Sequence, residues 1–209
     1  MRRLLASIAL ACACTGSALA QISIGVAGPG VSIGIQLQLY PNLVAVPGYP
    51  VYYAPGLDMN YFFYDGMYWV YYGNNWYTSA WYNGPWMLVS PLYVPAYVLR
   101  VPVRYYRVPP PYFRPWYADA PPRWDEYWGN DWQRQRRGWD AWDRRAVPPR
   151  APLPVYQRQY AGERYPTQIE RQQALNDQNY RYRPQDPDVR ERYRTPAPQG
   201  RPQVRGPEP

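Results

Sequence analysis

Side chains on which many enzymes depend are missing or scarce. Histidine and lysine do not occur, and the only cysteines are Cys12 and Cys14. These absences exclude Ser-His and Cys-His nucleophiles, imidazole and thiolate metal sites, Schiff-base lysines and P-loop lysines. Carboxylates, tyrosine, serine, threonine and arginine remain, so the enzyme class left open is a hydrolase with two paired carboxylates. We expect no metal ion, no cofactor and no enzymatic activity.

Residues 1–20 have the three parts of a secretory signal peptide. Arg2 and Arg3 form the basic start, residues 4–13 form the apolar stretch, and residues 18–20 form an Ala-Leu-Ala cleavage site. The mature chain is therefore expected to begin at Gln21. The apolar stretch is too short to span a bilayer, and no later segment has the ~18 apolar residues that a spanning helix needs. We expect an exported protein without a transmembrane span.

Cys12 and Cys14 both lie inside this leader. A lipoprotein signal would place an aliphatic residue three positions before the modified cysteine, whereas Ala9 and Ala11 occupy those positions. Lipidation is the alternative, and a cysteine-free mature protein is the favoured interpretation. Such a protein enters an oxidising compartment without a disulfide to stabilise its fold.

All 23 basic residues are arginine. The formal net charge of +8 falls to +6 once Arg2 and Arg3 leave with the signal peptide. The planar guanidinium group favours stacked or bidentate contacts with aromatic rings, carboxylates and phosphates. Mixed tyrosine and arginine also occur in proteins that bind single-stranded nucleic acid, but export argues against that partner. We expect contact with an anionic surface or an envelope polysaccharide, and no contact with nucleic acid.

Turn signals recur at regular intervals through the middle of the chain. They are Asp65-Gly66, Asn74-Asn75 and Asn83-Gly84, and the segments between them are largely aromatic. Such pairs tolerate the positive φ angles that two-residue hairpin turns require. The spacing therefore predicts a four-strand antiparallel meander.

Two-residue turns determine which side chains face each other across this meander. One aromatic row is expected to contain Phe63, Tyr68, Trp81 and Trp86. The opposite face is expected to carry Phe62, Trp69, Ala80 and Met87 in one row and Tyr64, Met67, Tyr82 and Pro85 in another. Either the rings form a core, or the first row is exposed and stacks on sugar rings. In the second case Phe63, Tyr68, Trp81 and Trp86 are the ligand-binding residues.

Both faces of the meander need cover, and the flanking sequences supply two candidates. Residues 31–39 alternate between apolar and polar, and residues 22–26 begin a similar pattern before a Gly-Pro-Gly turn, so a hairpin is expected. Residues 123–145 carry tryptophans at helical spacing, which predicts a helix with one tryptophan face. Gly129 and Gly138 are expected to weaken or break this helix.

The remaining segments are rich in proline. Prolines throughout residues 91–122 argue against helices and central strands, so this segment is expected to be extended and to lie over the sheet. Beyond residue 146 tryptophan is absent and Pro, Gln and Arg dominate, which predicts a disordered tail over residues 146–209. Within it, Thr167-Gln168-Ile169-Glu170 has the pattern of a capping box and predicts a short helix over residues 167–179.

Four aromatic strings stand out along the chain. They are YDGMYW at residues 64–69, WYNGPW at residues 81–86, VPVRYYR at residues 101–107 and WGNDW at residues 128–132. These strings resemble a family of exported proteobacterial proteins that has no assigned function, and the resemblance covers about residues 45–195. It implies a place in the envelope of a Gram-negative bacterium, either periplasmic or associated with the outer envelope. It implies no activity.

The predicted architecture is mainly β, with about four to six antiparallel strands in a domain over residues 21–120, one Trp-rich helix and a disordered C-terminal tail. The favoured function is a non-enzymatic cell-envelope protein with a structural or assembly role through aromatic and arginine surfaces. The alternative is glycan or peptidoglycan binding by aromatic stacking on the meander face, which burial of Trp81 and Trp86 would exclude. A carboxylate hydrolase is the third hypothesis. Its candidate acids, which neighbouring arginines are expected to pair, are Asp125, Glu126, Asp131, Asp140 and Asp143.

Overall fold

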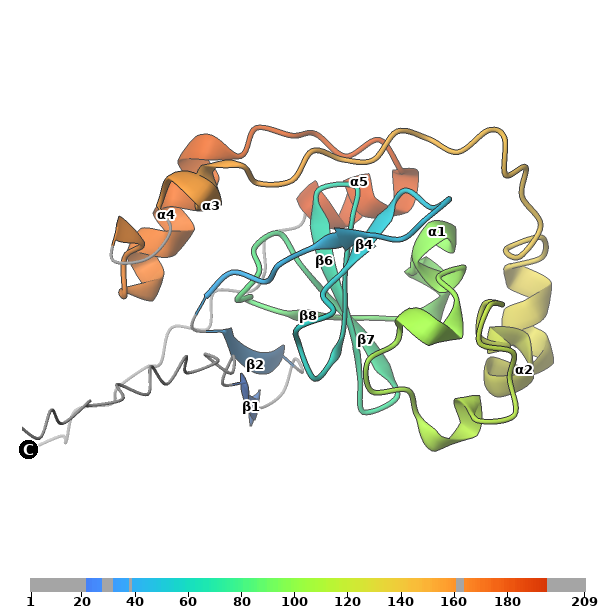
Figure 1. Ribbon diagram of the computed structural model, residues 1–209. Helices are drawn as coiled ribbons and strands as arrows, with labels where there is room; N and C mark the ends of the chain where they lie inside the picture. The colour runs from blue at the N-terminus through green and yellow to red at the C-terminus, as the bar shows by residue number, and fades with distance from the viewer. Residues whose placement is uncertain (1–21, 28–31, 38, 161–163, 195–209) are drawn as a thin grey trace, which may run out of the picture.

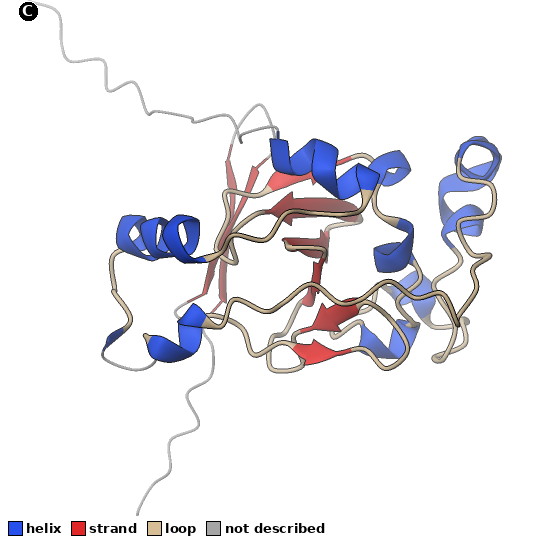
Figure 2. Cartoon of the chain, turned by 90° about the horizontal axis from the view of Figure 1, so that it is seen from above, coloured by secondary structure: helices blue, strands red, loops and turns tan. Residues whose placement is uncertain are grey.

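The computed structural model of the protein describes residues 22–27, 32–37, 39–160 and 164–194. The predicted signal peptide, with Cys12 and Cys14, lies outside the described residues. Within them the chain forms a six-stranded antiparallel sheet, a two-stranded sheet and short helices (Figure 1). Figure 2 shows the strands in the middle of the molecule with the helices placed around them. The predicted mainly β architecture is confirmed.

The strands of the larger sheet follow one another in the order of the sequence. They are β3 (Val44–Ala45), β4 (Val51–Tyr53), β5 (Asn60–Tyr64), β6 (Met67–Tyr72), β7 (Asn75–Ser79) and β8 (Met87–Val89). The smaller sheet pairs β1 (Ile22–Ala27) with β2 (Ser32–Leu37), which confirms the predicted N-terminal hairpin. With the short strands β3 and β4 the meander has six strands, the largest number in the predicted range of four to six.

The first predicted turn forms as expected. Tyr64 pairs with Met67, so Asp65-Gly66 is a two-residue turn between β5 and β6. Both turn residues have positive φ, 48° at Asp65 and 84° at Gly66. Turns of this kind match the right-handed twist of the strands that they join. The local sequence is therefore sufficient to place this hairpin and its register.

The second turn lies one residue earlier than predicted. Its two central residues are Gly73 and Asn74, both with positive φ. Glycine has no Cβ and adopts positive φ more readily than any other residue, which favours Gly73 over Asn75 in the turn. The shift moves cross-strand partners by two residues, so Tyr68 faces Ser79. The side chains of β7 keep their predicted faces, because an even shift preserves the alternation of a strand.

The third predicted turn, Asn83-Gly84 as a tight hairpin, is wrong. β7 ends at Ser79 and β8 begins at Met87, and residues 80–86 form a longer loop between them. The Asn83 side chain instead pairs with the backbone of Leu37 at the end of β2. The Leu37 N–H donates to Asn83 Oδ1 at 2.6 Å, and Asn83 Nδ2 donates to the Leu37 carbonyl at 2.9 Å. Asn83 thereby joins the N-terminal hairpin to the larger sheet.

Two hydrophobic cores lie against the two faces of the larger sheet. In one core, Phe62 and Trp69 pack with Trp124 from the Trp-rich segment. In the other, Phe63 packs with Ile35 of β2. The prediction that the Trp-rich helix covers one face and the N-terminal strands help to cover the other is confirmed.

The expectation that residues 91–122 are purely extended is wrong. This segment contains four short helices, which are η1 (Pro91–Tyr93), α1 (Ala96–Leu99), η2 (Val103–Tyr105) and η3 (Pro111–Phe113). A proline stands at or just before the first residue of each helix. At that position its missing N–H breaks no helical hydrogen bond. The prolines therefore keep the helices short without preventing them.

The Trp-rich helix, α2 (Trp124–Gln135), is shorter than the predicted range of residues 123–145. Gly129 has non-helical angles inside it, with φ 80° and ψ −178°. Gly138, which follows the end of the helix, also has a φ of 80°. The predicted break at Gly129 is confirmed, and the helix ends before it reaches Gly138. Figure 1 shows α2 at the side of the molecule, with α1 between it and the sheet.

Much of the segment that was predicted to be a disordered tail has defined structure in the described residues. Helices after residue 146 are α3 (Tyr156–Gln159), α4 (Ile169–Asn179) and α5 (Pro187–Arg194). Val189 is buried in one core and Tyr165 in the other. These side chains attach to the sheet a polar segment whose average composition predicted disorder. We call residues 164–194 the C-terminal arm, and residues 195–209 lie outside the described residues.

Helix α4 confirms the short helix predicted over residues 167–179. Its N-cap is Gln168, which makes no side-chain capping hydrogen bond, so the predicted capping box is not used. None of the described helices is both long and apolar enough to cross a bilayer.

Candidate functional site

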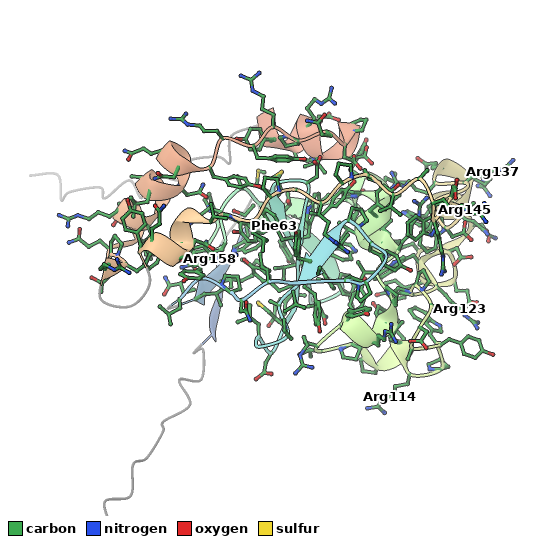
Figure 3. The ribbon with its side chains drawn as sticks, turned by 45° about the horizontal axis from the view of Figure 1, so that its top comes forward. Phe63, Arg114, Arg123, Arg137, Arg145 and Arg158 are labelled. Atoms are coloured by element: carbon green, nitrogen blue, oxygen red, sulfur yellow. The ribbon has the colours of Figure 1, made fainter. Side chains whose placement is uncertain are left out.

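The four predicted ligand-binding residues are all buried. Their exposed fractions are 0% for Phe63, 1% for Tyr68, 3% for Trp81 and 1% for Trp86. Figure 3 shows Phe63 in the interior of the molecule. Tyr82, which was expected on the opposite face, joins the same core because the loop of residues 80–86 replaces a tight turn. No ligand can stack on this row, so the rings form a core and the alternative of an exposed stacking platform is excluded.

The C-terminal arm covers part of this core with alternating residues. Tyr180 and Tyr182 pack against the core, and the ring of Tyr180 lies 6.4 Å from that of Phe63 between centroids. Arg181 and Arg183 are exposed. Successive side chains of an extended backbone point to opposite sides. One short segment therefore covers the core with tyrosine and presents arginine to solvent.

The Asp65 carboxylate fastens the arm to the first hairpin turn. Its Oδ1 accepts a hydrogen bond from the Tyr182 hydroxyl at 2.7 Å, and its Oδ2 accepts from the backbone N–H groups of Gln185 and Asp186, each at 2.7 Å. Asp65 is only 6% exposed, so these donors take the place of the water that would otherwise solvate its carboxylate. Gly66 leaves room for the arm, since a Cβ there would lie 2.6 Å from the Tyr182 ring. The Asp-Gly turn thus serves both the hairpin and the arm.

A second carboxylate, Asp186, holds the start of α5 against β5. Its Oδ2 accepts a hydrogen bond from the Tyr64 hydroxyl at 2.9 Å, and its Oδ1 accepts from the N–H of Asp188 at 2.9 Å. Burial raises the pKa of the Asp186 carboxyl above its ordinary value, and the hydrogen bond from Tyr64 opposes this shift. Burial, followed by the charge of Asp186, raises the pKa of Tyr64. The pair is therefore a partly desolvated contact between the arm and the sheet.

These two carboxylates border a pocket of about 640 Å³. Its flat walls are three tyrosines and three prolines, namely Tyr64, Tyr97, Tyr182, Pro148, Pro149 and Pro187. Arg150 also lines the pocket. Its Nε donates to the carbonyl of Tyr49 at 2.9 Å and its Nη2 donates to that of Val46 at 3.2 Å. The pocket therefore joins ring surfaces with groups of both charges.

Two of the candidate catalytic acids form ion pairs on the surface of α2. Glu126 pairs with Arg123 at 3.0 Å, and Asp131 pairs with Arg134. All four side chains are largely exposed, where ion pairs contribute little to stability. The described residues contain no group of three carboxylates that could hold a metal ion.

Another two of these acids, Asp125 and Asp140, line a pocket of about 400 Å³. Arg134 and Arg137 line the same pocket, and Asp140 is exposed. A carboxylate pair in a hydrolase needs two acids in different environments, so that one donates a proton while the other stays ionised. A solvated pocket shared with two guanidinium groups favours charge pairing over that division of roles.

Two arginines act inside the protein as donors to backbone carbonyls. The Arg100 guanidinium donates to the carbonyls of residues 138, 139 and 141. Arg136 donates to the carbonyls of Leu92 and Val94 at 2.9 and 2.8 Å. The fork of donors on a guanidinium suits such multiple contacts, which a lysine could not make. Sequence analysis missed this role, because no local signal distinguishes these arginines from exposed ones.

Most other arginines lie at the surface. Those labelled at the periphery in Figure 3 are Arg114, Arg123, Arg137, Arg145 and Arg158. On the C-terminal arm, the exposed arginines are Arg164, Arg171, Arg181, Arg183 and Arg190. The exposed acids of the arm are Glu170, Asp177 and Glu191. The outer surface of the arm is therefore basic.

The change Asp65→Ala is expected to loosen the arm. It leaves two N–H groups and the Tyr182 hydroxyl without their acceptor, at a cost of about 2–3 kcal/mol to the attached state. Trypsin should then cleave after Arg181 at least tenfold faster than in the unchanged protein, whereas Arg183 precedes Pro184 and is not a trypsin site. Asp65→Asn is the matched control, because asparagine tolerates positive φ and its carbonyl can still accept from the backbone. Equal cleavage rates for the alanine and asparagine variants would contradict a fastening role for this side chain.

No protein-family model, no curated protein and no solved structure matches the chain. Function must therefore be inferred from the surface, the pockets and the charges of the chain itself.

Proposed function

We propose that the protein is a non-enzymatic component of the cell envelope that makes structural contact with an anionic surface through the arginines of its C-terminal arm. The observation that carries this proposal is the alternation in residues 180–183, which packs the partly buried Tyr180 and Tyr182 against the core and leaves Arg181 and Arg183 exposed. The predicted signal peptide and the resemblance to exported proteobacterial proteins support a periplasmic or outer-envelope location in a Gram-negative bacterium.

The direction of the charges on the arm supports an anionic partner. Two acids of the arm face inward, where Asp186 accepts from Tyr64 at 2.9 Å and Asp188 pairs with Arg136 at 3.3 Å. The exposed arginines therefore outnumber the exposed acids. Salt screens such charges beyond about 8–10 Å, so they act on a surface at close contact. Each arginine near an anionic membrane surface contributes about 1 kcal/mol to binding.

Sedimentation with lipid vesicles tests this proposal. The mature protein is expected to sediment with vesicles of phosphatidylglycerol and phosphatidylethanolamine, and to release from them as salt is added. The double change Arg181→Gln with Arg183→Gln is expected to lower the partition coefficient about thirtyfold, since it removes about 2 kcal/mol of attraction. Vesicles of phosphatidylcholine alone should retain little protein. Equal retention by the two kinds of vesicle would contradict the proposal.

A matched double variant separates the arm from net charge. The double change Arg123→Gln with Arg134→Gln also removes two positive charges, but from side chains that already pair with Glu126 and Asp131. We expect this variant to lose clearly less binding than the arm variant. The same loss in both variants would mean that binding follows total charge, and the arm would not be the contact surface.

A further inference from the structure

The pocket bordered by the β5–β6 turn, residues 148–151 and the start of α5 has the size of a small-ligand site. Its volume of about 640 Å³ lies within the range of ~300–1,000 Å³ that such sites occupy. Tyrosine and proline side chains form most of its wall. The rings of Tyr64 and Tyr97 lie 5.8 Å apart between centroids and are inclined by 42° to each other. The wall thus presents flat apolar surfaces at more than one angle.

Hydrogen-bond acceptors and a hydrogen-bond donor lie beside these flat surfaces. Each carboxylate oxygen accepts two hydrogen bonds, and Asp65 Oδ1 accepts one from the described residues. The Asp186 carboxylate accepts three within the same part of the chain, from the Tyr64 hydroxyl and from the backbone N–H groups of Asp188 and Val189, and keeps one acceptor position open there. Arg150 uses its Nε and Nη2 for backbone carbonyls, and within the described residues its other terminal nitrogen stays available as a donor for a ligand. A ligand with hydroxyl groups would match both kinds of partner.

Charges of both signs meet at the pocket. Asp65, Asp186 and Arg150 line it, and a second cation, Arg100, lies outside the lining, with its guanidinium carbon 5.2 Å from the centroid of the Tyr97 ring. A charged ligand would meet attraction and repulsion of similar size at such a site, whereas a neutral polar ligand gains from every group. The balance therefore favours a neutral ligand.

We propose that this pocket binds a neutral sugar of one or two rings. The C–H face of a pyranose packs on aromatic rings, and the hydroxyl groups at its edge bond to carboxylate and guanidinium groups. The residues involved are different from Phe63, Tyr68, Trp81 and Trp86, which are buried. The proposal is also independent of the anionic-surface contact, because the exposed Arg181 and Arg183 do not line the pocket.

Saturation-transfer NMR on the mature protein tests the proposal with four probes. Cellobiose, maltose and N,N′-diacetylchitobiose are disaccharides, and sorbitol is an open-chain polyol that lacks a ring face. We expect saturable binding of at least one disaccharide and none of sorbitol. The backbone N–H signals of Gln185 and Asp186, which bond to Asp65 in the wall, should shift on binding. The signal of Asn74, in the distant second turn, should not.

The change Asp186→Asn locates the binding in this pocket. It keeps the shape of the side chain and an acceptor for Tyr64, but it removes the charge that strengthens hydrogen bonds from sugar hydroxyls. We expect at least a tenfold loss of affinity, while Asp58→Asn, an exposed acid outside this pocket, leaves affinity unchanged. The proposal is overturned if no disaccharide binds saturably, if sorbitol binds equally, or if Asp186→Asn binds as tightly as the unchanged protein. Loss of sugar binding with retained vesicle binding would separate the pocket from the surface of the arm.

Discussion

The protein is expected to unfold cooperatively between about pH 10 and pH 12. Burial raises the pKa of the hydroxyl groups of Tyr61 and Tyr106 well above the ordinary value of 10.0. It also raises the pKa values of Tyr64 and Tyr112. In the unfolded chain these tyrosines ionise near pH 10, whereas the folded state keeps their protons. Stability that is complete below pH 10 is therefore lost as the pH rises.

The size of this loss is sufficient to unfold a small domain. A tyrosine that ionises at pH 10 in the unfolded chain and stays neutral in the folded state removes about 2.7 kcal/mol of stability by pH 12. Tyr61 and Tyr106 are both fully buried, so together they remove about 5 kcal/mol. This equals the whole free energy of unfolding of a marginally stable domain.

Phenolate absorbance and circular dichroism, followed together as the pH rises, check the prediction. The buried tyrosines should ionise in the same steep transition in which secondary structure is lost. Tyr106→Phe is a useful comparison, because the Tyr106 hydroxyl is buried without a hydrogen-bond partner among the described residues. Its removal should move the transition to higher pH. A gradual rise in phenolate absorbance before any loss of structure would contradict the expected coupling.

The largest loss of stability from one substitution is expected for Trp124→Ala. Trp124 is fully buried, and its ring packs edge-on against Tyr71, Trp76 and Phe113. Its Nε1 donates to the carbonyl of Leu99 at 2.9 Å. Removing a buried tryptophan costs about 3–5 kcal/mol through lost contacts and the cavity left behind. Here the change also leaves a buried carbonyl without its donor.

Urea unfolding of the variant measures this cost, with Trp128→Ala as the matched control. Trp128 stacks on Trp124 at 4.4 Å between centroids but is only partly buried. We expect its removal to cost about 1–2 kcal/mol. The two variants test whether α2 is attached to the sheet mainly through its first residue. Equal losses for both would show that the whole tryptophan row shares the attachment.

Local features that depend on a few adjacent residues were predictable. Asp65-Gly66 forms the first hairpin turn because both residues adopt positive φ at low cost. Gly129 and Gly138 interrupt the Trp-rich segment for a similar reason. The second turn was predicted at Asn74-Asn75, but Gly73 tolerates positive φ at least as well, and the turn forms at Gly73-Asn74. Local preference there allowed more than one turn, and strand pairing selected between them.

The candidate site was much less predictable. The row around Phe63 had the composition of a stacking surface, yet Tyr180 and Tyr182 from the distant arm pack over this core. Average composition predicted disorder for that arm, because a few anchoring side chains do not change an average. The pocket beside Asp65 depends on the same segment, since Tyr182 and Asp186 form part of its wall. No spacing in the sequence places these groups next to the first hairpin turn.

Composition alone excluded histidine, lysine and thiol chemistry, and local periodicity was sufficient for the strands of the meander and for a Trp-rich helix. These results need no contacts between distant residues, because they follow from the side chains present and from backbone preferences over a few positions. The exposure of each aromatic ring, and the division of arginines between buried donors and surface charges, were decided by the tertiary structure. Hydrophobic burial is not directional, so the cover of an apolar face depends on which distant segment packs there, as the arm does over Phe63.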